Sequence, residues 1–561
     1  MNELGILEGL KELYGEKAGE VKKQVDAVIE KYRSSLPYYE KQLSEKDVVL
    51  ITYADTIRRE GQFPLEILDE FLGENLDGLI NTIHLLPFFP FSSDDGFAVT
   101  DYYAVNPEFG IWDHIERLSA KYHLMFDAVI NHMSKDSDWF KGFLAGKSDF
   151  ANFFIEVDEK DERLKQVFRP RALPLVHKYP AKSGEIKSVW TTFSEDQVDL
   201  NYANGRVFVA ILELLLFYIS KGARLIRLDA IGFIWKRLGT TCLHLPETHL
   251  VIQLYREIVE SLTSGILFIT ETNVPHKDNI SYFGNGNNEA HLVYNFTLPP
   301  LLAFSLITSN VQKLNKWLSG LDLPLGEACY FNFTASHDGI GLQPVKDILS
   351  GEEIAKLEHR VQVNNGFVSY KDNPDGTCSP YELNCSYLNI VSHPEDSRQL
   401  KAQKFLLTQA FMLTLPGLPG IYIHSLLGTQ NDLTAVEKSG IKRRINRSKL
   451  NYNKLLETLS EEGSLRNLVF TGYKKLLRIR RSYEWFAPFL RFETKTDNNQ
   501  VIVIQKKRGK TRFWAVFNFS DKARNFCLYQ NKKVKNLITG DVEHSDKIFL
   551  EPYAYHWYES V

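Results

Sequence analysis

Three carboxylic acids in this sequence each follow a short apolar run, at or near the point where the run ends. Asp229 closes LIRL, Glu271 closes ILFIT, and Asp338 comes soon after the run that begins at Ala328. Short apolar runs rich in branched residues are typical of buried strands in a parallel sheet. Because such strands end at the same edge, we expect the three carboxylates to share one pocket there.

Arg227 lies inside one of these runs, two residues before Asp229. Residues two apart in a strand point to the same side, so the two side chains are expected to form an ion pair. A neighbouring guanidinium lowers the pKa of a carboxyl, so we expect Asp229 to be ionised at neutral pH. A carboxylate nucleophile requires that state. A buried ion pair with a packing role only is the alternative that these two residues leave open.

The three carboxylates together point to a reaction class. Carboxylates in one pocket repel one another, so their pKa values must differ. That suits glycosyl transfer, in which one carboxylate attacks the anomeric carbon while a protonated carboxyl donates to the leaving oxygen. Other polar residues fall at the ends of neighbouring predicted strands: Asp94, Asp127 with Asn131 and His132, and His337.

The elements that must position these residues alternate between strand and helix. Helical segments such as residues 112–122 separate the apolar runs, which predicts repeated βαβ units and a parallel sheet. A (β/α)8 TIM barrel with inserted loops fits this order better than a doubly wound sheet. The predicted strands are residues 48–53, 79–86, 124–130, the run within 222–236, 266–270, 293–296, 328–335 and 420–423.

Two long segments interrupt the alternation, each directly after a predicted strand. Both are expected to rise over the C-terminal mouth of the barrel, where active sites of this fold lie. Alternating segments near the end of the chain predict antiparallel strands. The predicted domains are a helical extension (1–44), the barrel or domain A (45–133, 204–338 and 397–487), domain B (134–203), domain B′ with a mobile loop (339–396), and a C-terminal β domain (488–561).

Composition argues against several function classes. The chain has 561 residues and a net charge of −4, which gives no reason to expect nucleic acid or an anionic membrane as partner. It contains no apolar run long enough to span a membrane and no signal-peptide core. Five scattered cysteines without a CxxC pair argue against zinc sites and disulfide frameworks. We therefore expect a cytoplasmic protein without metal or cofactor.

Four segments in order give these residues a wider context. DAVINH (127–132), RLDAIG (227–232), ITETN (269–273) and SHD (336–338) resemble the characteristic segments of the α-amylase superfamily, glycoside hydrolase family 13. The resemblance covers the chain from about residue 46 onward. It implies the same barrel, an inserted domain after the third strand and a C-terminal β domain.

The resemblance also implies roles for the strand-end residues. Asp229 would be the nucleophile, Glu271 the general acid/base and Asp338 the transition-state stabiliser. Arg227 would orient the nucleophile. The glucosyl ring would be held by His132 and His337.

Further motifs resemble the sucrose phosphorylase branch, in which phosphate replaces water as the second nucleophile. They are ITYAD (51–55), HLLPFFPFSSDDGF (84–97), RPRALP (169–174), HDGIGL (337–342) and RRINR (443–447). The resemblance implies that Asp94 and Arg447 form a pair gripping the far hydroxyls of the glucosyl unit, and that Phe193 caps the intermediate. It places Arg171 and Tyr381 on movable loops that contact phosphate or acceptor.

Within that branch, several segments look most similar to the glucosylglycerate phosphorylases: ITETNVPHKDNI (269–280), VWTTF (189–193), DNPDGT (372–377) and AVEKSG (435–440). Glu382 follows Tyr381 where sucrose phosphorylases carry Gln. The implied reaction is retaining phosphorolysis of 2-O-α-D-glucosylglycerate to α-D-glucose 1-phosphate and D-glycerate through a β-glucosyl-enzyme. The expected phosphate and acceptor contacts are Arg171, Phe233, Asn273, Tyr381 and Glu382, with His276 and Lys277 as further contacts and residues 233–242 as a wall.

Alternatives remain open at this point. Sucrose, sucrose 6-phosphate and glucosylglycerol phosphorylases share the same branch, and a hydrolase of the superfamily would use the same carboxylates. A catalytically dead barrel retained as scaffold or transporter subunit is the non-enzymatic reading. The expected partners are a small sugar substrate and inorganic phosphate, and the sequence leaves a homodimer open.

Overall fold

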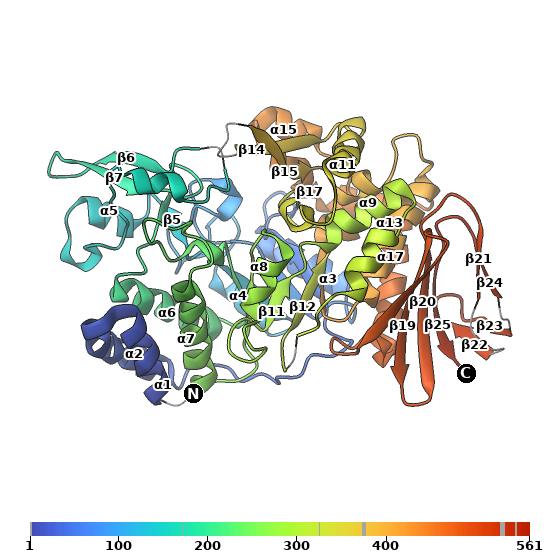
Figure 1. Cartoon of the computed structure of the whole chain (residues 1–561), viewed down its shortest axis with the longest axis horizontal. Coiled ribbons are helices and arrows are strands. Elements are labelled where there is room, and N and C mark those ends of the chain that lie inside the picture. Colours follow the sequence, from blue (N-terminus) through green and yellow to red (C-terminus); the bar gives the residue numbers. More distant parts are fainter. Residues whose placement is uncertain (1–2, 172, 325, 373–376, 528–532, 545–546) are drawn as a thin grey trace.

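The computed structural model describes residues 3–171, 173–324, 326–372, 377–527, 533–544 and 547–561. Within these ranges eight parallel strands close into a barrel in the spatial order β1-β16-β12-β11-β10-β9-β4-β3 (Figure 1). The predicted (β/α)8 barrel is confirmed. Its strands are β1 (Val49–Thr52), β3 (Thr82–Leu85), β4 (His123–Ala128), β9 (Ala223–Leu228), β10 (Leu267–Thr270), β11 (Leu292–Tyr294), β12 (Cys329–Phe333) and β16 (Leu418–Tyr422).

Strand register explains which polar side chains meet. Asp127 on β4 is the register partner of Arg227 on β9. Leu228 on β9 is the partner of Thr270 on β10, so Asp229 and Glu271, one residue further on, leave the barrel side by side. The register therefore brings Asp127, Arg227, Asp229 and Glu271 together at the mouth of the barrel.

Helices cover the outside of the barrel and return the chain between strands, as βαβ connections require. The longer ones are α3 (Pro64–Asn75), α4 (Trp112–Ser119), α6 (Gly205–Ser220), α7 (Pro246–Leu262), α9 (Leu298–Thr308), α10 (Gln312–Ser319), α13 (Arg398–Thr414) and α17 (Leu465–Ser482). Further elements complete the connections: β2 (Ile57–Arg58), α8 (His276–Ile280), α14 (Ile423–Leu426), α15 (Leu433–Ser439), β17 (Leu450–Asn451) and α16 (Tyr452–Ser460).

Two insertions rise over the same end of the barrel, at the top of Figure 1. The first contains β5 (His132–Ser134), α5 (Asp138–Leu144), β6 (Val176–Pro180), β7 (Ile186–Trp190) and β8 (Gln197–Asp199). The second contains β13 (Ile340–Gly341), α11 (Gly351–Val363), β14 (Phe367–Asp372), β15 (Cys378–Asn384) and α12 (Tyr387–Val391). They lie where the sequence places its two interruptions. The domain boundaries drawn from the sequence stay a prediction.

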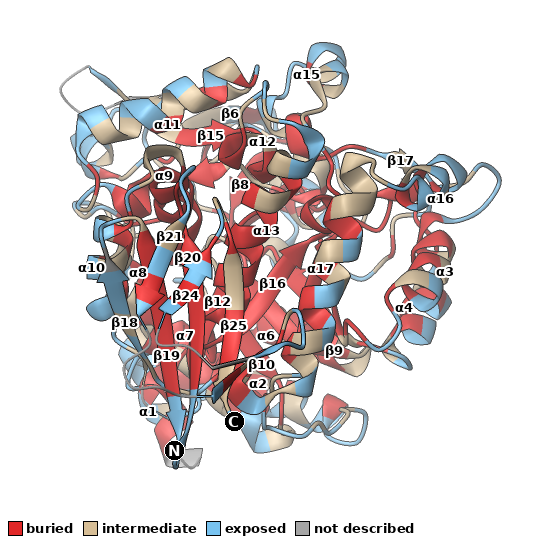
Figure 2. Ribbon diagram, turned by 90° about the vertical axis from the view of Figure 1, so that its right-hand side faces the viewer, coloured by how far each residue is buried: buried red, intermediate tan, exposed pale blue. Residues whose placement is uncertain are grey.

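A six-stranded antiparallel sheet follows the barrel, in the spatial order β18-β19-β20-β25-β22-β23. Its inner face is buried against the barrel helices (Figure 2). Phe411 of α13 meets Phe517 of β20 with ring centroids 5.0 Å apart, and Trp557 Nε1 donates to Thr414 Oγ1 at 2.9 Å. The strands are β18 (Phe492–Asp497), β19 (Val501–Arg508), β20 (Thr511–Asn518), β22 (Lys533–Asn536), β23 (Val542–His544) and β25 (Tyr555–Ser560), with β21 (Arg524–Cys527) and β24 (Lys547–Leu550) paired beside them.

The predicted N-terminal helices are α1 (Glu3–Tyr14) and α2 (Ala18–Tyr32), which pack against α7 and α6 (Figure 1). The approach is close because Gly9 faces Leu254 and Gly205 faces Val21, where a methyl group would collide with the leucine or valine side chain. Tyr14 links α1 to the body of the protein: its hydroxyl donates to Tyr202 O at 3.1 Å and its ring lies 6.3 Å from that of Trp235.

In the part of the chain that the model describes, no helix has the length and apolar character needed to cross a membrane. In the same residues, no group of three or more His, Cys, Asp or Glu side chains is arranged to hold a metal ion.

Candidate active site

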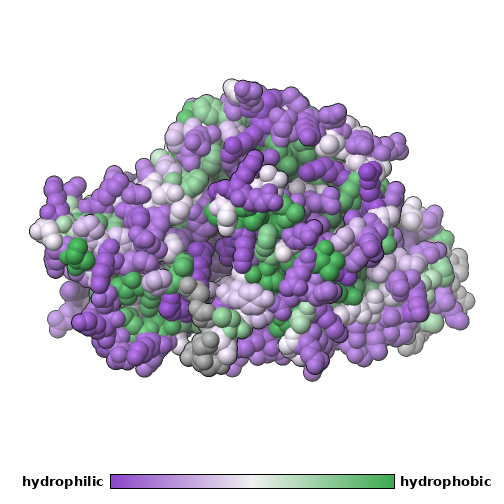
Figure 3. All heavy atoms as spheres, turned by 90° about the horizontal axis from the view of Figure 1, so that it is seen from above, coloured by the Kyte–Doolittle hydropathy of each residue, from purple (hydrophilic) through white to green (hydrophobic). Residues whose placement is uncertain are grey.

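A cavity of about 670 Å³ opens at the C-terminal mouth of the barrel, between the two insertions. Figure 3 shows this face from above, hollowed near its centre. Most of the predicted site residues line the cavity: Asp94, His132, Arg171, Phe193, Asp229, Phe233, Glu271, Asn273, His337, Asp338, Tyr381 and Glu382. Residues from the barrel strands and from both insertions thus converge on one cavity, as such an active site requires.

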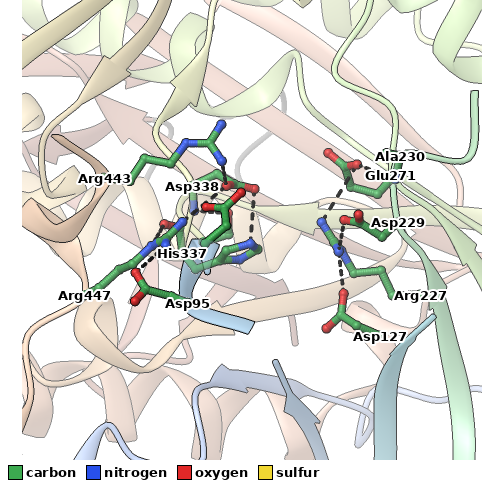
Figure 4. Close-up of polar contacts among 12 residues, drawn as sticks. Asp95, Asp127, Arg227, Asp229, Ala230, Glu271, His337, Asp338, Arg443 and Arg447 are labelled. Carbon is green, nitrogen blue, oxygen red and sulfur yellow. Dashed lines mark hydrogen bonds and ion pairs between the residues drawn. The ribbon is translucent and has the colours of Figure 1, made fainter. Parts of the chain in front are cut away.

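Arg227 is the buried centre of the carboxylate group (Figure 4). Its Nη1 donates to Asp229 Oδ1 at 2.7 Å and also to Asp127 Oδ1. Its Nη2 lies 3.9 Å from Glu271 Oε2, which accepts the backbone N–H of Ala230 at 3.1 Å. One guanidinium therefore fixes Asp229 and lies next to Glu271, which confirms the expected Arg227–Asp229 pair.

The protonation of Asp229 and Glu271 depends on burial as well as on Arg227. Burial raises the pKa of Asp229 to about 8, with Arg227 opposing the rise and the charges of Glu271 and Asp127 adding to it. Burial also raises the pKa of Glu271. Desolvation thus acts against the ionised state that the sequence predicts for Asp229, and Arg227, whose guanidinium Asp127 shares, offsets part of that effect. Two carboxyls in one site are expected to hold one proton between them.

Asp338 lies opposite this pair and has cations of its own (Figure 4). Arg443 Nη1 approaches its Oδ1 at 2.7 Å, and His337 Nε2 lies 3.3 Å from its Oδ2. Although burial opposes it, Arg443 and His337 hold the pKa of Asp338 well below its usual range. Asp338 is therefore ionised, while Asp229 and Glu271 share one proton.

Asp94 and Arg447, which we expect to grip the far hydroxyls of the glucosyl unit together, each bond a different residue in the structure. Arg447 Nη1 bonds Asp95 Oδ2 at 2.8 Å, whereas Asp94 Oδ2 accepts from Arg171 Nη2 at 3.1 Å. Asp94 (φ 53°) and Asp95 (φ 50°) both adopt the left-handed conformation that costs a non-glycine residue about 1 kcal/mol or more. This turn directs the first aspartate into the cavity and the second onto Arg447.

Aromatic side chains form one wall of the cavity. The ring of Phe193 lies 5.2 Å from that of His132 and 5.4 Å from that of Phe233, edge to face with the latter. On the other side, Phe97 stacks on His337 at 4.7 Å with an interplanar angle of 4°. Apolar rings beside charged groups are suited to the faces and hydroxyls of a sugar ring.

A buried ion pair supports this wall from behind. Lys236 Nζ lies 2.6 Å from Asp199 Oδ2 and donates to Asn131 Oδ1 at 2.7 Å. Asp199 accepts the backbone N–H of Thr192, next to Phe193, at 2.7 Å. Asn131 precedes His132 and its Nδ2 lies 3.2 Å from the His132 Nδ1. Within residues 233–242, Lys236 thus supports the wall and Phe233 lines the cavity.

The acceptor side agrees in part with the sequence. Tyr381, Glu382 and Asn273 line the cavity, but His276 and Lys277 do not. Helix α8 turns His276 toward the rings of Trp317 and Tyr330, and Lys277 is exposed, so their predicted acceptor contacts are wrong. Residues 373–376 of DNPDGT and residue 172 of RPRALP lie outside the described residues.

Sequence reasoning missed several residues of the site. Arg443 lines the cavity and contacts both Asp338 and Glu382. Gln197 also lines it, with Nε2 3.2 Å from His132 Nε2. Asp95 holds Arg447 from outside the cavity. The RRINR motif already contained Arg443, but its spacing does not show which arginine faces the cavity.

Comparison with known proteins gives a consistent result. The model of the alpha-amylase catalytic domain matches residues 76–338. The chain is 48% identical to a glucosylglycerate phosphorylase of Spirochaeta thermophila over 85% of this chain and 82% of that protein. It is 43% identical to the glucosylglycerate phosphorylase of Escherichia coli strain K12, over 92% of each. Glucosylglycerol and sucrose phosphorylases are more distant relatives.

Among solved structures, the fold is similar to that of a sucrose 6F-phosphate phosphorylase from Thermoanaerobacter thermosaccharolyticum. The two superpose with a TM-score of 0.75 over 87% of this chain and 95% of that one, at 24% sequence identity.

Proposed function

Because the chain belongs to the alpha-amylase family, within its group of glucosylglycerate phosphorylases, we propose that the cavity carries out retaining phosphorolysis of 2-O-α-D-glucosylglycerate. The enzyme is a disaccharide phosphorylase that releases α-D-glucose 1-phosphate and D-glycerate. The observation that carries the mechanism is the single Arg227 guanidinium that holds Asp229 at 2.7 Å and lies 3.9 Å from Glu271, with the two carboxyls on adjacent strands.

The first step forms a covalent intermediate. A carboxylate oxygen of Asp229 attacks the anomeric carbon, the bond from that carbon to the glycerate oxygen breaks, and Glu271 donates its proton to the departing oxygen. In the reactive arrangement the one proton of the pair is on Glu271, and Asp229, which accepts the Arg227 hydrogen bond, is the ionised member. Asp338, ionised and opposite the pair, stabilises the positive charge that develops on the glucosyl ring.

The second step regenerates the enzyme. A phosphate oxygen attacks the anomeric carbon, the ester bond to Asp229 breaks, and Glu271 accepts the proton that phosphate gives up. Two inversions at the anomeric carbon leave the α configuration unchanged. Neither step needs a metal or an organic cofactor, because carboxyl groups supply both the nucleophile and the proton.

The remaining predicted residues divide between the two parts of the cavity. We assign the glucosyl unit to Asp94, His132, Phe193, Arg227, His337 and Arg447. Arg447 does not line the cavity, but its Nη2 lies 3.7 Å from Asp338 Oδ1 without a hydrogen-bond partner among the described residues, which supports a position directly behind the glucosyl site. We assign phosphate and acceptor to Arg171, Phe233, Asn273, Tyr381 and Glu382.

The acceptor is tested by running the reaction in reverse. The enzyme is incubated with α-glucose 1-phosphate and, separately, with D-glycerate, fructose, fructose 6-phosphate or glycerol, and phosphate release is measured. Glycerate should give the highest kcat/KM. A higher value with fructose, fructose 6-phosphate or glycerol would contradict this assignment and favour another phosphorylase of the same branch. Cytoplasmic location and homodimer formation stay predictions from the sequence.

A further inference from the structure

Arg443 is a cation held between two carboxylates on the acceptor side of the cavity. Its Nε and Nη2 form a two-pronged pair with Glu382, at 3.0 and 2.6 Å, and its Nη1 approaches Asp338 Oδ1 at 2.7 Å. The Glu382 side chain is 4% exposed, whereas that of Arg443 is 26% exposed. Glu382 is thus the buried anchor, and Arg443 is the partner that faces the cavity.

Glu382 cannot readily move away from this position. Its residue pairs with Gly341 in the β13–β15 ladder, and a methyl group on Gly339 would lie 2.5 Å from its Cγ. A charge-assisted pair that uses two parallel hydrogen bonds fixes the plane of a guanidinium. The edge of Arg443 that carries Nε is therefore committed to Glu382, and Nη1 is the atom left to change partner.

The contact of Arg443 with Asp338 weakens the stabilisation that Asp338 is proposed to give to the glucosyl ring. A carboxylate that stabilises a developing positive charge does so less well while a guanidinium neutralises it. Asp338 keeps other partners if Arg443 leaves, since His337 Nε2 lies 3.3 Å away and Arg447 Nη2 lies 3.7 Å away. Nη1 can then turn to an anion in the cavity without leaving Asp338 unpaired.

Arg171 and Lys442 also line the cavity as cations, but neither has, among the described residues, a buried carboxylate anchor like Glu382. Arg171 is bonded to Asp94 at 3.1 Å and stands 5.5 Å over the ring of Phe193. Lys442 is exposed and donates to the backbone carbonyl of Val368 at 3.1 Å. Arg443 combines a cavity position, a buried anchor and contact with a catalytic carboxylate.

We propose that Arg443 recognises the anionic group of the acceptor, and that Glu382 is a positioning residue that holds Arg443 there. The group is the carboxylate of glycerate in one direction and an oxygen of phosphate in the other. On its arrival Nη1 exchanges Asp338 for the anion, which frees Asp338 to face the glucosyl ring. This inference rests on the proposed function and assigns the charged part of its acceptor site.

The test separates loading of the enzyme from transfer to an acceptor. α-D-Glucosyl fluoride loads the glucosyl-enzyme without phosphate, and the burst of fluoride released in the first turnover reports that step. Transfer is then measured with phosphate, D-glycerate and glycerol, the last being an uncharged acceptor of similar size. Arg443→Gln should release fluoride within about threefold of wild type while KM for phosphate and glycerate rises at least about tenfold, and transfer to glycerol should be unchanged.

Glu382→Gln keeps the shape of the anchor but removes its charge. It should show the same pattern with a smaller increase of KM, about threefold to tenfold, and little change of kcat. Arg443→Lys keeps a cation without the fork and should retain more phosphate affinity than Arg443→Gln. Arg508→Gln, at an exposed pair with Glu484 in the C-terminal sheet, is the matched control and should leave every parameter unchanged. Circular dichroism and thermal melting confirm that each variant folds.

Two results would overturn the inference. Equal loss of fluoride release and of transfer in Arg443→Gln would mean that Arg443 acts on Asp338 alone. Unchanged KM for both anions would give their recognition to Arg171 or Lys442. If the wild-type enzyme transferred glucose to glycerol but not to glycerate, the proposed function would fail, and the phosphate arm would still decide the role of Arg443.

Discussion

Asp229 and Glu271 occupy a place where burial opposes two negative charges. Arg227 relieves part of that cost, but its guanidinium also serves Asp127, so the carboxyl pair is expected to keep one proton near neutral pH. A nucleophile and a general acid need that state, with one carboxyl ionised and one protonated. Burial of the two carboxyls raises their pKa values and thereby keeps this proton bound.

Asp229→Asn tests the residue that carries this account. The amide cannot attack the anomeric carbon, so kcat for α-glucose 1-phosphate formation should fall by more than roughly four orders of magnitude. The exposed Asp149→Asn serves as control and should keep wild-type kcat. A fully active Asp229→Asn enzyme would remove Asp229 from the mechanism.

The same variant should be more stable than wild type, and increasingly so as the pH rises. The folded pKa of Asp229, about 8, lies above its usual 3.8, so the folded state binds more protons than the unfolded state between these values. The wild-type protein therefore loses stability as the pH rises from 3.8 to about 8. Asn does not titrate, so the variant does not lose stability in this way. Tm measured at pH 5 and pH 8 should show a larger gain for the variant at pH 8. An equal gain at both values would mean that Asp229 is ionised throughout.

At the scale of elements, the loop after β9 joins the barrel to the first insertion through Lys236. The ion pair of Lys236 with Asp199 is almost fully buried. It reaches Phe193 through the backbone N–H of Thr192 and His132 through Asn131. Tyr14 of α1 touches the neighbouring Trp235, so the N-terminal helices support the same loop from the other side. The sugar-binding wall therefore depends on elements that make no contact with the cavity.

Lys236→Met tests whether the sugar-binding wall depends on this ion pair. It leaves Asp199 buried without its cation, which typically costs about 3–5 kcal/mol of stability. It should also raise KM for the glucosyl donor, because His132 and Phe193 lose their support. Lys187→Met removes a partly exposed pair with Glu156 and should cost about 1 kcal/mol or less. If denaturant unfolding showed equal losses for both variants, the buried pair would have no special role.

The barrel strands could be predicted from the sequence, because each predicted apolar run falls on one of them. The ends of these strands also bring Asp229, Glu271 and Asp338 into one cavity, as expected. The sequence was not sufficient where a side chain's partner depends on local backbone or burial. The left-handed turn at Asp94 and Asp95 sets Asp95 against Arg447, and α8 turns His276 away from the cavity. The pKa of Asp229 depends on desolvation, which pairing in the sequence does not show.

At the scale of the whole molecule, the barrel and the C-terminal sheet meet at a buried cation. Lys506 on β19 is 1% exposed and donates to the backbone carbonyl of Trp485 at 2.8 Å. Burial lowers its pKa to about 7, and Arg480 adds to that effect. The unfolded chain binds more protons than the folded one between about 7 and the usual 10.5, so stability should rise with pH across that range.

Lys506→Met should therefore raise stability most at or below pH 7, on the order of 2 kcal/mol after loss of the Trp485 hydrogen bond. The gain should shrink as the pH approaches 10, where the wild-type lysine is neutral in both states. Thermal unfolding at pH 6.5 and pH 9.5 measures the difference. A gain that stayed constant with pH would mean that Lys506 keeps its charge in the folded protein.

The most direct test of the central claim is to follow the forward reaction by proton NMR. The purified enzyme is mixed with 2-O-α-D-glucosylglycerate and inorganic phosphate, and the first glucosyl product is identified by its anomeric signal. Double displacement at Asp229 predicts α-D-glucose 1-phosphate, formed in equal amount to free glycerate. Appearance of the β-anomer, or of free glucose alone in the presence of phosphate, would contradict it.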